Sequence, residues 1–366
     1  MVELDSPTPN TTYTCQYVIS SWHVAVCSTF SALMALIAII GNSLVLFAII
    51  KTPRLRFVTS YFIASLAIGD LYMNTVLVPL WVVKLEQNIW TLDRHPLAVA
   101  IEFLSIQMAT SVAYNLCVVS IDRFISIKYV YEYSHILTSR LAFVIILAVW
   151  TFSLICSLPR LFLHDIKNIS RLFVTLAFVI IFLPYGVIIY CYVRIYKVAK
   201  IHANQIATND RLQTFATIET ERNKKAAVTI GLVIGIYSIL GIPVLVVAVV
   251  DGIITFSDPC KAVRLRVFWM WALALSYSHS AYNPWIYAAR NKLYNRAIKG
   301  ILGVKPNRLF ALGNTASVNQ ASTKKGKHEE SLQTSMKKGM EQSIKIDNRN
   351  EDTVHVNTDD NNCRSN

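Results

Sequence analysis

One ionisable residue, an aspartate, stands in the middle of an apolar stretch of this sequence, where a charge is costly. Asp70 directly follows Leu66-Ala-Ile-Gly, and an unpaired charge at mid-membrane depth costs at least about 2.5 kcal/mol. Its carboxylate therefore needs a proton, a cation or hydrogen-bond donors. Other apolar stretches hold candidate polar partners for it: Asn42, Ser280 and Asn283. Together these residues predict a polar core.

A second informative group stands near one end of the apolar stretches. Arg123 directly follows Asp122, and an arginine there is either restrained by a carboxylate or freed to contact an entering partner. Pro243 and Pro284 each remove a backbone hydrogen bond and bend their helices, so one inner half-helix can swing outward. Two tyrosines would then fill the gap and support Arg123: Tyr192 and Tyr287.

Long apolar helices must position these residues. Hydrophobic residues make up 54% of the chain and charged residues 16%, an apolar excess for a soluble protein. The apolar residues gather in blocks of about 20, the length that crosses the hydrocarbon core of a bilayer. The pattern predicts an all-α membrane protein, a seven-transmembrane helix bundle with spans at 24–50, 57–83, 97–127, 139–159, 171–198, 225–250 and 265–288.

Charge and glycosylation signals orient the bundle. Lys and Arg concentrate in the loops after the first, third and fifth helices, and none precedes Cys27, which favours an outside N-terminus. Asn10 and Asn168 begin glycosylation sequons on the predicted outside. The net charge of +13 then reflects cytoplasmic basic residues and not a nucleic-acid partner.

The flanking segments differ in character from the bundle. Residues 1–23 form the predicted extracellular N-terminus, and residues 24–302 the receptor-like domain. Its last part, about 291–302, alternates apolar and basic faces, which predicts an amphipathic eighth helix lying on membrane lipids. Residues 303–366 are rich in Ser, Thr, Lys, Asn and Asp, which predicts a disordered cytoplasmic tail with candidate phosphorylation sites.

The set of polar residues and prolines, one group per helix in order, resembles the rhodopsin-like (class A) family of G protein-coupled receptors across residues 24–302. Asp122-Arg123-Phe124 and Asn283-Pro284-Trp-Ile-Tyr287 carry the most specific part of the likeness. The resemblance implies a plasma-membrane receptor and no enzyme. It further implies an extracellular ligand, a heterotrimeric G protein as partner, and arrestin and receptor kinases acting through the tail.

The resemblance also implies a sodium pocket at Asp70 and a restraint on Arg123. Val112 and His279 replace residues that the family often uses around the ion, so binding of sodium and its absence both stay open. The family restrains the arginine with Asp122 and an acidic residue at the base of helix six. Asn223 occupies that second place, so this interhelical lock is missing or displaced.

Departures from the family narrow the ligand class. Tyr277 replaces the retinal-linked lysine of opsins, which argues against a photoreceptor. Ser105 replaces the aspartate that pairs with amine ligands. Ala98 occupies the helix-three position where the family usually has a disulfide-bonded cysteine. The chain therefore lacks the usual outer disulfide, as melanocortin and cannabinoid receptors do. By resemblance to melanocortin receptors, Cys15 and Cys260 could form another disulfide, and free thiols are the alternative.

The nearest likeness is of melanocortin, adenosine or cannabinoid type, and the ligand stays unassigned. Pocket candidates on the outer half of the bundle are Glu102, Ser105, Gln107, Trp269 and Tyr277. An unpaired Glu102 would favour a cationic small molecule or peptide. Gly241, in place of the usual helix-six tryptophan, and Asn223 motivate the alternative of a constitutively active or non-signalling receptor-like partner. A seven-helix transporter would be expected to show repeated halves, which the sequence lacks.

Overall fold

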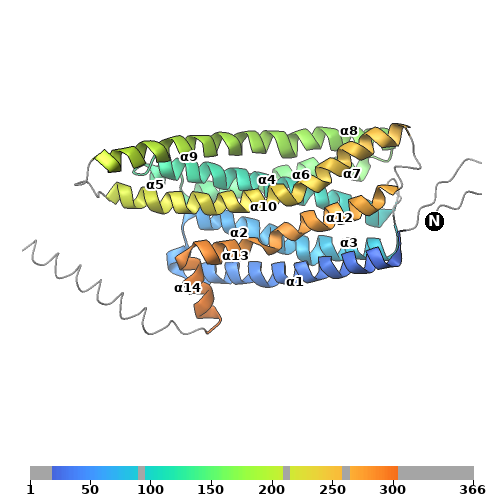
Figure 1. The fold of residues 1–366 in the computed structure, drawn as a ribbon, viewed down its shortest axis with the longest axis horizontal. Coiled ribbons are helices and arrows are strands. Elements are labelled where there is room, and N and C mark those ends of the chain that lie inside the picture. Colours follow the sequence, from blue (N-terminus) through green and yellow to red (C-terminus); the bar gives the residue numbers. More distant parts are fainter. Residues whose placement is uncertain (1–18, 90–94, 209–214, 258–263, 304–366) are drawn as a thin grey trace, which may run out of the picture. The chain divides into compact units, whose positions relative to one another are not determined.

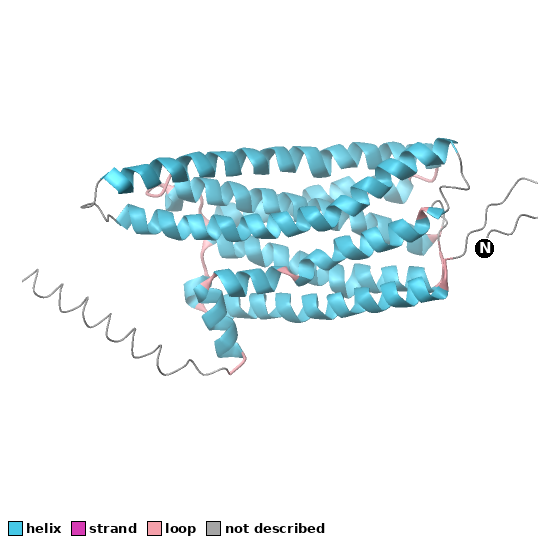
Figure 2. Cartoon of the chain, in the orientation of Figure 1, coloured by secondary structure: helices cyan, strands magenta, loops and turns pink. Residues whose placement is uncertain are grey.

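The computed structural model describes residues 19–89, 95–208, 215–257 and 264–303, and these ranges contain helices and no strand (Figure 2). The long helices, with the turns that join some of them, are α1 (Ser21–Lys51), α2 (Val58–Tyr72), η2 (Met73–Leu77), α3 (Val78–Glu86), α4 (Pro96–Lys128), α6 (Ser139–Ser157), α8 (Ile166–Ala177), η3 (Phe178–Phe182), α9 (Leu183–Thr208), α10 (Phe215–Ser257), α12 (Arg266–Tyr277), η4 (Ser278–Ala281) and α13 (Asn283–Arg290). The remaining elements are η1 (Pro53–Leu55), α5 (Tyr133–Ile136), α7 (Pro159–Phe162) and α14 (Lys292–Ile301).

These elements form the expected seven membrane-spanning segments. In the described ranges, six helical stretches are long and apolar enough to cross a bilayer. The seventh segment consists of α12 and α13, which the 3-10 turn η4 separates into two shorter helices. The segments run alongside one another in Figure 1, and α4 packs against α2, α6, α9 and α10.

Prolines explain most of the irregular turns. A proline has no N–H to donate and its ring clashes with the carbonyl four residues earlier, so the helix adjusts just before it. The π-helical turns η2 and η3 end two residues before Pro79 and Pro184. Pro284 stands in the first turn of α13, three residues after η4 ends, whereas Pro243 lies inside α10.

Apolar side chains cover the outside of the bundle and polar ones lie within it. Ile40, Leu147 and Phe178 are each more than half exposed, as expected for surfaces that face lipid tails. Asn42, Asp70 and Asn283 are buried. This inverse distribution confirms that the helices are membrane spans.

The amphipathic helix predicted near 291–302 is α14. It lies across one end of the bundle in Figure 1. Its buried Tyr294 donates a hydrogen bond to Ser60 of α2 at 3.1 Å, while Arg296 and Lys299 are exposed. The contact with α2 fixes the inner end of the bundle.

The loop between the fourth and fifth segments is shorter than predicted. Residues 160–171 were expected to be an outer loop, but α7 continues to Phe162 and α8 starts at Ile166. Pro159 suits the first turn of a helix, and Asp165 caps α8 by accepting the Asn168 N–H at 3.3 Å. The sequon residue Asn168 is thus exposed in the first turn of α8. Asn10, Cys15 and Cys260 lie outside the described residues.

Gly41 marks the closest approach between α1 and the seventh segment. A Cβ atom placed there would lie 2.7 Å from Pro284 Cγ, and the proline ring has little freedom to move. Replacing Gly41 by alanine should therefore lower stability by about 1–3 kcal/mol through overpacking. The measurement is the apparent thermal midpoint of the purified protein.

The control for Gly41→Ala is Gly186→Ala, because an added Cβ at Gly186 meets nothing within 4 Å. Alanine favours a helix over glycine, so this control should keep or raise the midpoint. Equal midpoints for the two variants would show that the α1–α13 contact is not tight.

Candidate functional site

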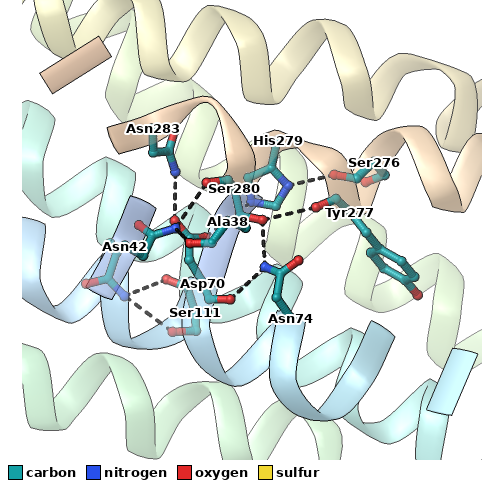
Figure 3. Close-up of polar contacts among 11 residues, drawn as sticks. Ala38, Asn42, Asp70, Asn74, Ser111, Ser276, Tyr277, His279, Ser280 and Asn283 are labelled. Atoms are coloured by element: carbon teal, nitrogen blue, oxygen red, sulfur yellow. Dashed lines mark hydrogen bonds and ion pairs between the residues drawn. The ribbon is translucent and has the colours of Figure 1, made fainter. Parts of the chain in front are cut away.

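A polar core joins α1, α2 and the seventh segment at the middle of the bundle (Figure 3). Asn283 donates to Asp70 Oδ2 at 2.9 Å, which brings together two residues that are distant in sequence. Asn42 donates to the Ser280 carbonyl at 3.1 Å. The four residues predicted to form this core are therefore in one buried cluster.

Asn74 also belongs to the core, although the sequence did not single it out. Its amide donates to the Ser280 hydroxyl at 2.7 Å and to the Asp70 carbonyl at 2.7 Å. The Ser280 hydroxyl in turn donates to the Tyr277 carbonyl. Asn74 lies one turn beyond Asp70 in η2, and this spacing was the available signal.

His279 connects the polar core to α10. Its Nε2 atom lies 3.8 Å from Asp70 Oδ1, and its Nδ1 atom lies 2.6 Å from the Ser276 carbonyl. The edge-to-face contact with the Tyr237 ring has a centroid distance of 5.0 Å. A movement of α10 at Tyr237 would therefore displace the imidazole next to Asp70.

Asp122 and Arg123 form a buried network at the inner end of α4. Arg123 Nε donates to Asp122 Oδ2 at 2.8 Å, and Arg123 Nη2 contacts both Asp122 Oδ2 and the Thr59 hydroxyl. Thr59 donates to Asp122 Oδ2 at 2.8 Å, and Tyr133 donates to Oδ1 at 2.6 Å. The Asp122 carboxylate therefore holds Arg123 and is itself held by donors from α2 and α5.

Tyr133 is outside the membrane spans and remains a donor. Burial, and after it the Asp122 charge, raises the pKa of its phenol above the ordinary value. Sequence reasoning did not assign roles to Thr59 or Tyr133. A hydroxyl at a helix end reads as a neutral or capping residue, so only the packing of α2 and α5 against α4 reveals the network.

The two inner tyrosines do not touch Arg123 through a hydrogen bond in this structure. Tyr192 donates to the Ala227 carbonyl of α10 at 3.0 Å. The Tyr287 hydroxyl is buried without a hydrogen-bond partner among the described residues. The side chain of Asn223 lies outside the described part.

Ser105 and Tyr277 join α4 to α12 in the outer half of the bundle. Their hydroxyl oxygens are 2.9 Å apart, and the Tyr277 ring meets Trp81 edge to face with a centroid distance of 6.1 Å. Gln107 is half-buried on α4. Among the described residues, the region at Ser105 contains hydroxyls and aromatic rings, and the Glu102 carboxylate interacts electrostatically with Tyr277.

Glu102 is not the unpaired carboxylate that the sequence allowed. Arg160 Nε donates to Glu102 Oε2 at 2.5 Å, and Arg160 Nη1 donates to the Leu163 carbonyl at 3.1 Å. The Arg160 side chain is fully buried, whereas that of Glu102 is 14% exposed. The condition on which Glu102 would favour a cationic ligand is not met, because the protein supplies the cation.

Further positive charge surrounds this pair. The Lys84 ammonium interacts electrostatically with Glu102, Arg160 and Arg266, so side chains from α3, α4, α7 and α12 converge. Arg266 is half-buried and has no hydrogen bond or ion pair with any described residue. Within the described ranges, this outer cluster of Lys84, Glu102, Arg160 and Arg266 holds three cationic side chains and one carboxylate.

Trp269 belongs to a helix interface. Its indole N–H donates to Asp251 Oδ2 of α10 at 3.2 Å, which ties α12 to α10. Its place among the pocket candidates is therefore not supported by a contact with Tyr277 or Ser105. The other candidate residues do lie on elements that meet in the outer half of the bundle.

Comparison with known proteins shows which protein family this architecture belongs to. The family model for the 7 transmembrane receptor (rhodopsin family) matches residues 41–287. The chain is 30% identical over 311 residues to the 5-hydroxytryptamine receptor 4 of Rattus norvegicus, covering 75% of each chain. It is 26% identical over 332 residues to the alpha-1A adrenergic receptor of Homo sapiens, covering 77% of this chain and 70% of that receptor.

The family match runs from within α1 to within α13 and includes Asp70, Asp122 and Asn283. Members of this family are multi-pass receptors of the plasma membrane that respond to extracellular ligands and activate heterotrimeric G proteins, and they are not enzymes. The fold, the Asp70 core and the Asp122–Arg123 pair agree with that assignment. The chain is a rhodopsin-like G protein-coupled receptor.

Proposed function

We propose that Arg123 is the switch of this receptor and that the described conformation is its resting form. The buried guanidinium, bonded to Asp122 and Thr59, carries this proposal. An outward movement of the inner part of α10, bent at Pro243, would break the Tyr192–Ala227 bond. Tyr192 and Tyr287 then support the released Arg123, which contacts the G protein.

The tail supplies the regulatory partners in this proposal. Serines and threonines beyond Gly303 accept phosphates from receptor kinases, and the phosphorylated tail binds arrestin. Helix α14 rests on the inner leaflet through its apolar side chains, with exposed Arg296 and Lys299 near anionic lipid headgroups.

We also propose that the extracellular ligand carries an acidic group. The outer cluster has three cations and one carboxylate in the described ranges, and the Glu102 carboxylate already accepts from Arg160. A ligand carboxylate or phosphate would neutralise the half-buried Arg266. A ligand ammonium would meet the Ser105 and Tyr277 hydroxyls and a Glu102 carboxylate that Arg160 already holds.

A screen with two matched compound panels tests both parts. Small amines and small carboxylates or phosphates of similar size are applied to transfected cells with a broad G protein readout. We expect responses to the acidic panel, and a fall in potency of about 10- to 100-fold in Arg266→Gln, the worth of a charge-assisted hydrogen bond. Arg123→Ala, at equal surface amount, should lose the response without losing ligand binding.

The outcomes separate the two proposals. Responses to amines alone would contradict the acidic ligand but leave the receptor function intact. A full response from Arg123→Ala would contradict the switch whatever the ligand. Arg264→Gln is the matched control for Arg266→Gln, because Arg264 is exposed near the start of the same segment.

A further inference from the structure

One oxygen of the Asp70 carboxylate is not satisfied by a hydrogen bond. Oδ2 accepts from Asn283, whereas Oδ1 has no hydrogen-bond partner among the described residues. The His279 Nε2 atom, likewise without a partner in that part of the chain, lies 3.8 Å from Oδ1. Figure 3 shows the imidazole beside the carboxylate. The two open atoms face each other in the centre of the bundle.

The residues around Asp70 fit a sodium ion poorly. Hard cations are held by several oxygen ligands, while imidazole nitrogen suits softer metals. Val112, at the α4 position implied as a ligand, offers no oxygen. The Ser280 hydroxyl accepts from Asn74 and donates to the Tyr277 carbonyl, so one lone pair of its oxygen is already used.

Two other oxygens near the core remain open in the described structure: Asn42 Oδ1 and the Tyr287 hydroxyl. They come from α1 and α13, and among the described residues α4 contributes no buried side-chain oxygen that lacks a hydrogen-bond partner. The His279 Nε2 atom takes up the space next to Asp70 Oδ1, at a distance of 3.8 Å. That donor set does not favour sodium.

The hydrogen bonding of His279 fixes how it can serve Asp70. The Ser276 carbonyl can only accept, so Nδ1 at 2.6 Å must carry a hydrogen. If the ring were neutral and Asp70 ionised, a nitrogen lone pair would face a carboxylate oxygen. The imidazole therefore fills the space next to Oδ1 with a nitrogen group, where a sodium ion would need oxygen ligands.

We infer that the His279 imidazole takes the place of the sodium ion beside Asp70 and that the receptor is therefore insensitive to sodium. The inference goes beyond the proposed switch and ligand, because it concerns ion binding to the purified protein. It can fail while the receptor function holds. The Tyr237 contact gives this pair a direct link to α10.

The first test compares thermal midpoints of the purified receptor in sodium chloride and in N-methylglucamine chloride at equal concentration. We expect the same midpoint in both salts. A saturable rise in sodium that disappears in Asp70→Asn would overturn the inference. This comparison needs no ligand and no signalling assay.

The second test restores an oxygen-rich site. The double variant Val112→Ser with His279→Asn replaces the alkyl group and the imidazole by groups with oxygen atoms. It should gain a sodium-dependent rise in midpoint of about 2–4 °C at saturating sodium. Adding Asp70→Asn to this double variant should abolish the gain.

A folded double variant with no response to sodium would also overturn the inference, because the two side chains would then not be what excludes the ion. If the double variant does not fold, the wild-type comparison decides alone. His279→Asn by itself supplies a further check. It should lower the midpoint in N-methylglucamine chloride, since Asp70 loses its internal partner, and an unchanged midpoint contradicts the pairing.

Discussion

Glu102→Gln should destabilise the receptor more than Arg160→Gln, although the two residues form one ion pair. Removing Glu102 takes the counter-charge from a fully buried guanidinium that also interacts with the Lys84 cation. Breaking a buried pair in this way costs about 3–5 kcal/mol. Removing Arg160 leaves a partly exposed Glu102 that still interacts with Lys84, so we expect about half of that cost.

The measurement is the apparent thermal midpoint of the purified variants, together with the amount at the cell surface. A double variant, Glu102→Gln with Arg160→Met, should recover most of the loss, because replacing both charges is often close to neutral. Glu86→Gln is the matched control, an exposed carboxylate on α3 that accepts from Ser28 at 2.8 Å. Equal losses for the two single variants would show that Lys84 does not support Glu102.

This pair also explains how the outer bundle holds together without the family's usual disulfide. Ala98 lies one turn before Glu102 on α4, and a disulfide at Ala98 is impossible. Arg160 instead bonds Glu102 on one side and the carbonyl of Leu163 on the other. The short connection to α8 is therefore tied to α4 through a side chain, and no long outer loop is needed.

The parts of the fold that the sequence predicted are those with a local signal. Long apolar runs predicted all seven segments. Asp70 and Asn283 predicted a polar core, because buried polar groups need partners. Helix ends were less well placed: α8 begins at Ile166, whereas the span was expected at 171. An apolar pattern marks the hydrocarbon core, but a helix continues beyond it while its backbone bonds are satisfied.

The residues that sequence reasoning missed or misplaced depend on how helices face one another. Arg160 looked like a loop cation, and only the convergence of α7 with α4 makes it the partner of Glu102. Trp269 stays a pocket candidate, and its indole hydrogen bond to Asp251 depends on how α12 faces α10. The 3-10 turn η4 between α12 and α13 is likewise a feature that the apolar pattern of the sequence does not predict.

Asp122→Asn is expected to raise ligand-independent signalling through Arg123. The Asp122 carboxylate bonds Arg123 and accepts from Thr59 and Tyr133, so it holds α4, α2 and α5 in the resting arrangement. Hydrogen bonds to charged groups contribute about 1.5–3 kcal/mol, which corresponds to a shift of about 10- to 100-fold toward the active form. The residues Asn223 and Gly241 motivated the alternative of high basal activity. Whether basal activity is high thus depends on how well this network replaces the missing interhelical lock.

Graded variants make the expectation specific. Thr59→Val and Tyr133→Phe each remove one donor to Asp122 and should raise basal G protein activation less than Asp122→Asn does. Tyr129→Phe is the matched control, because its hydroxyl contacts Lys128 and has no hydrogen bond with Asp122. Basal nucleotide exchange per receptor at the cell surface is the readout.

The decisive comparison combines Asp122→Asn with Arg123→Ala. If Asp122 acts by restraining Arg123, the double variant must be as silent as Arg123→Ala, because the released group is gone. High basal activity in the double variant would mean that the carboxylate restrains α2 and α5 independently of Arg123. Unchanged basal activity in Asp122→Asn, at normal surface amount, would instead place the restraint on α10 with Tyr192, whose bond to the Ala227 carbonyl is then the contact to break.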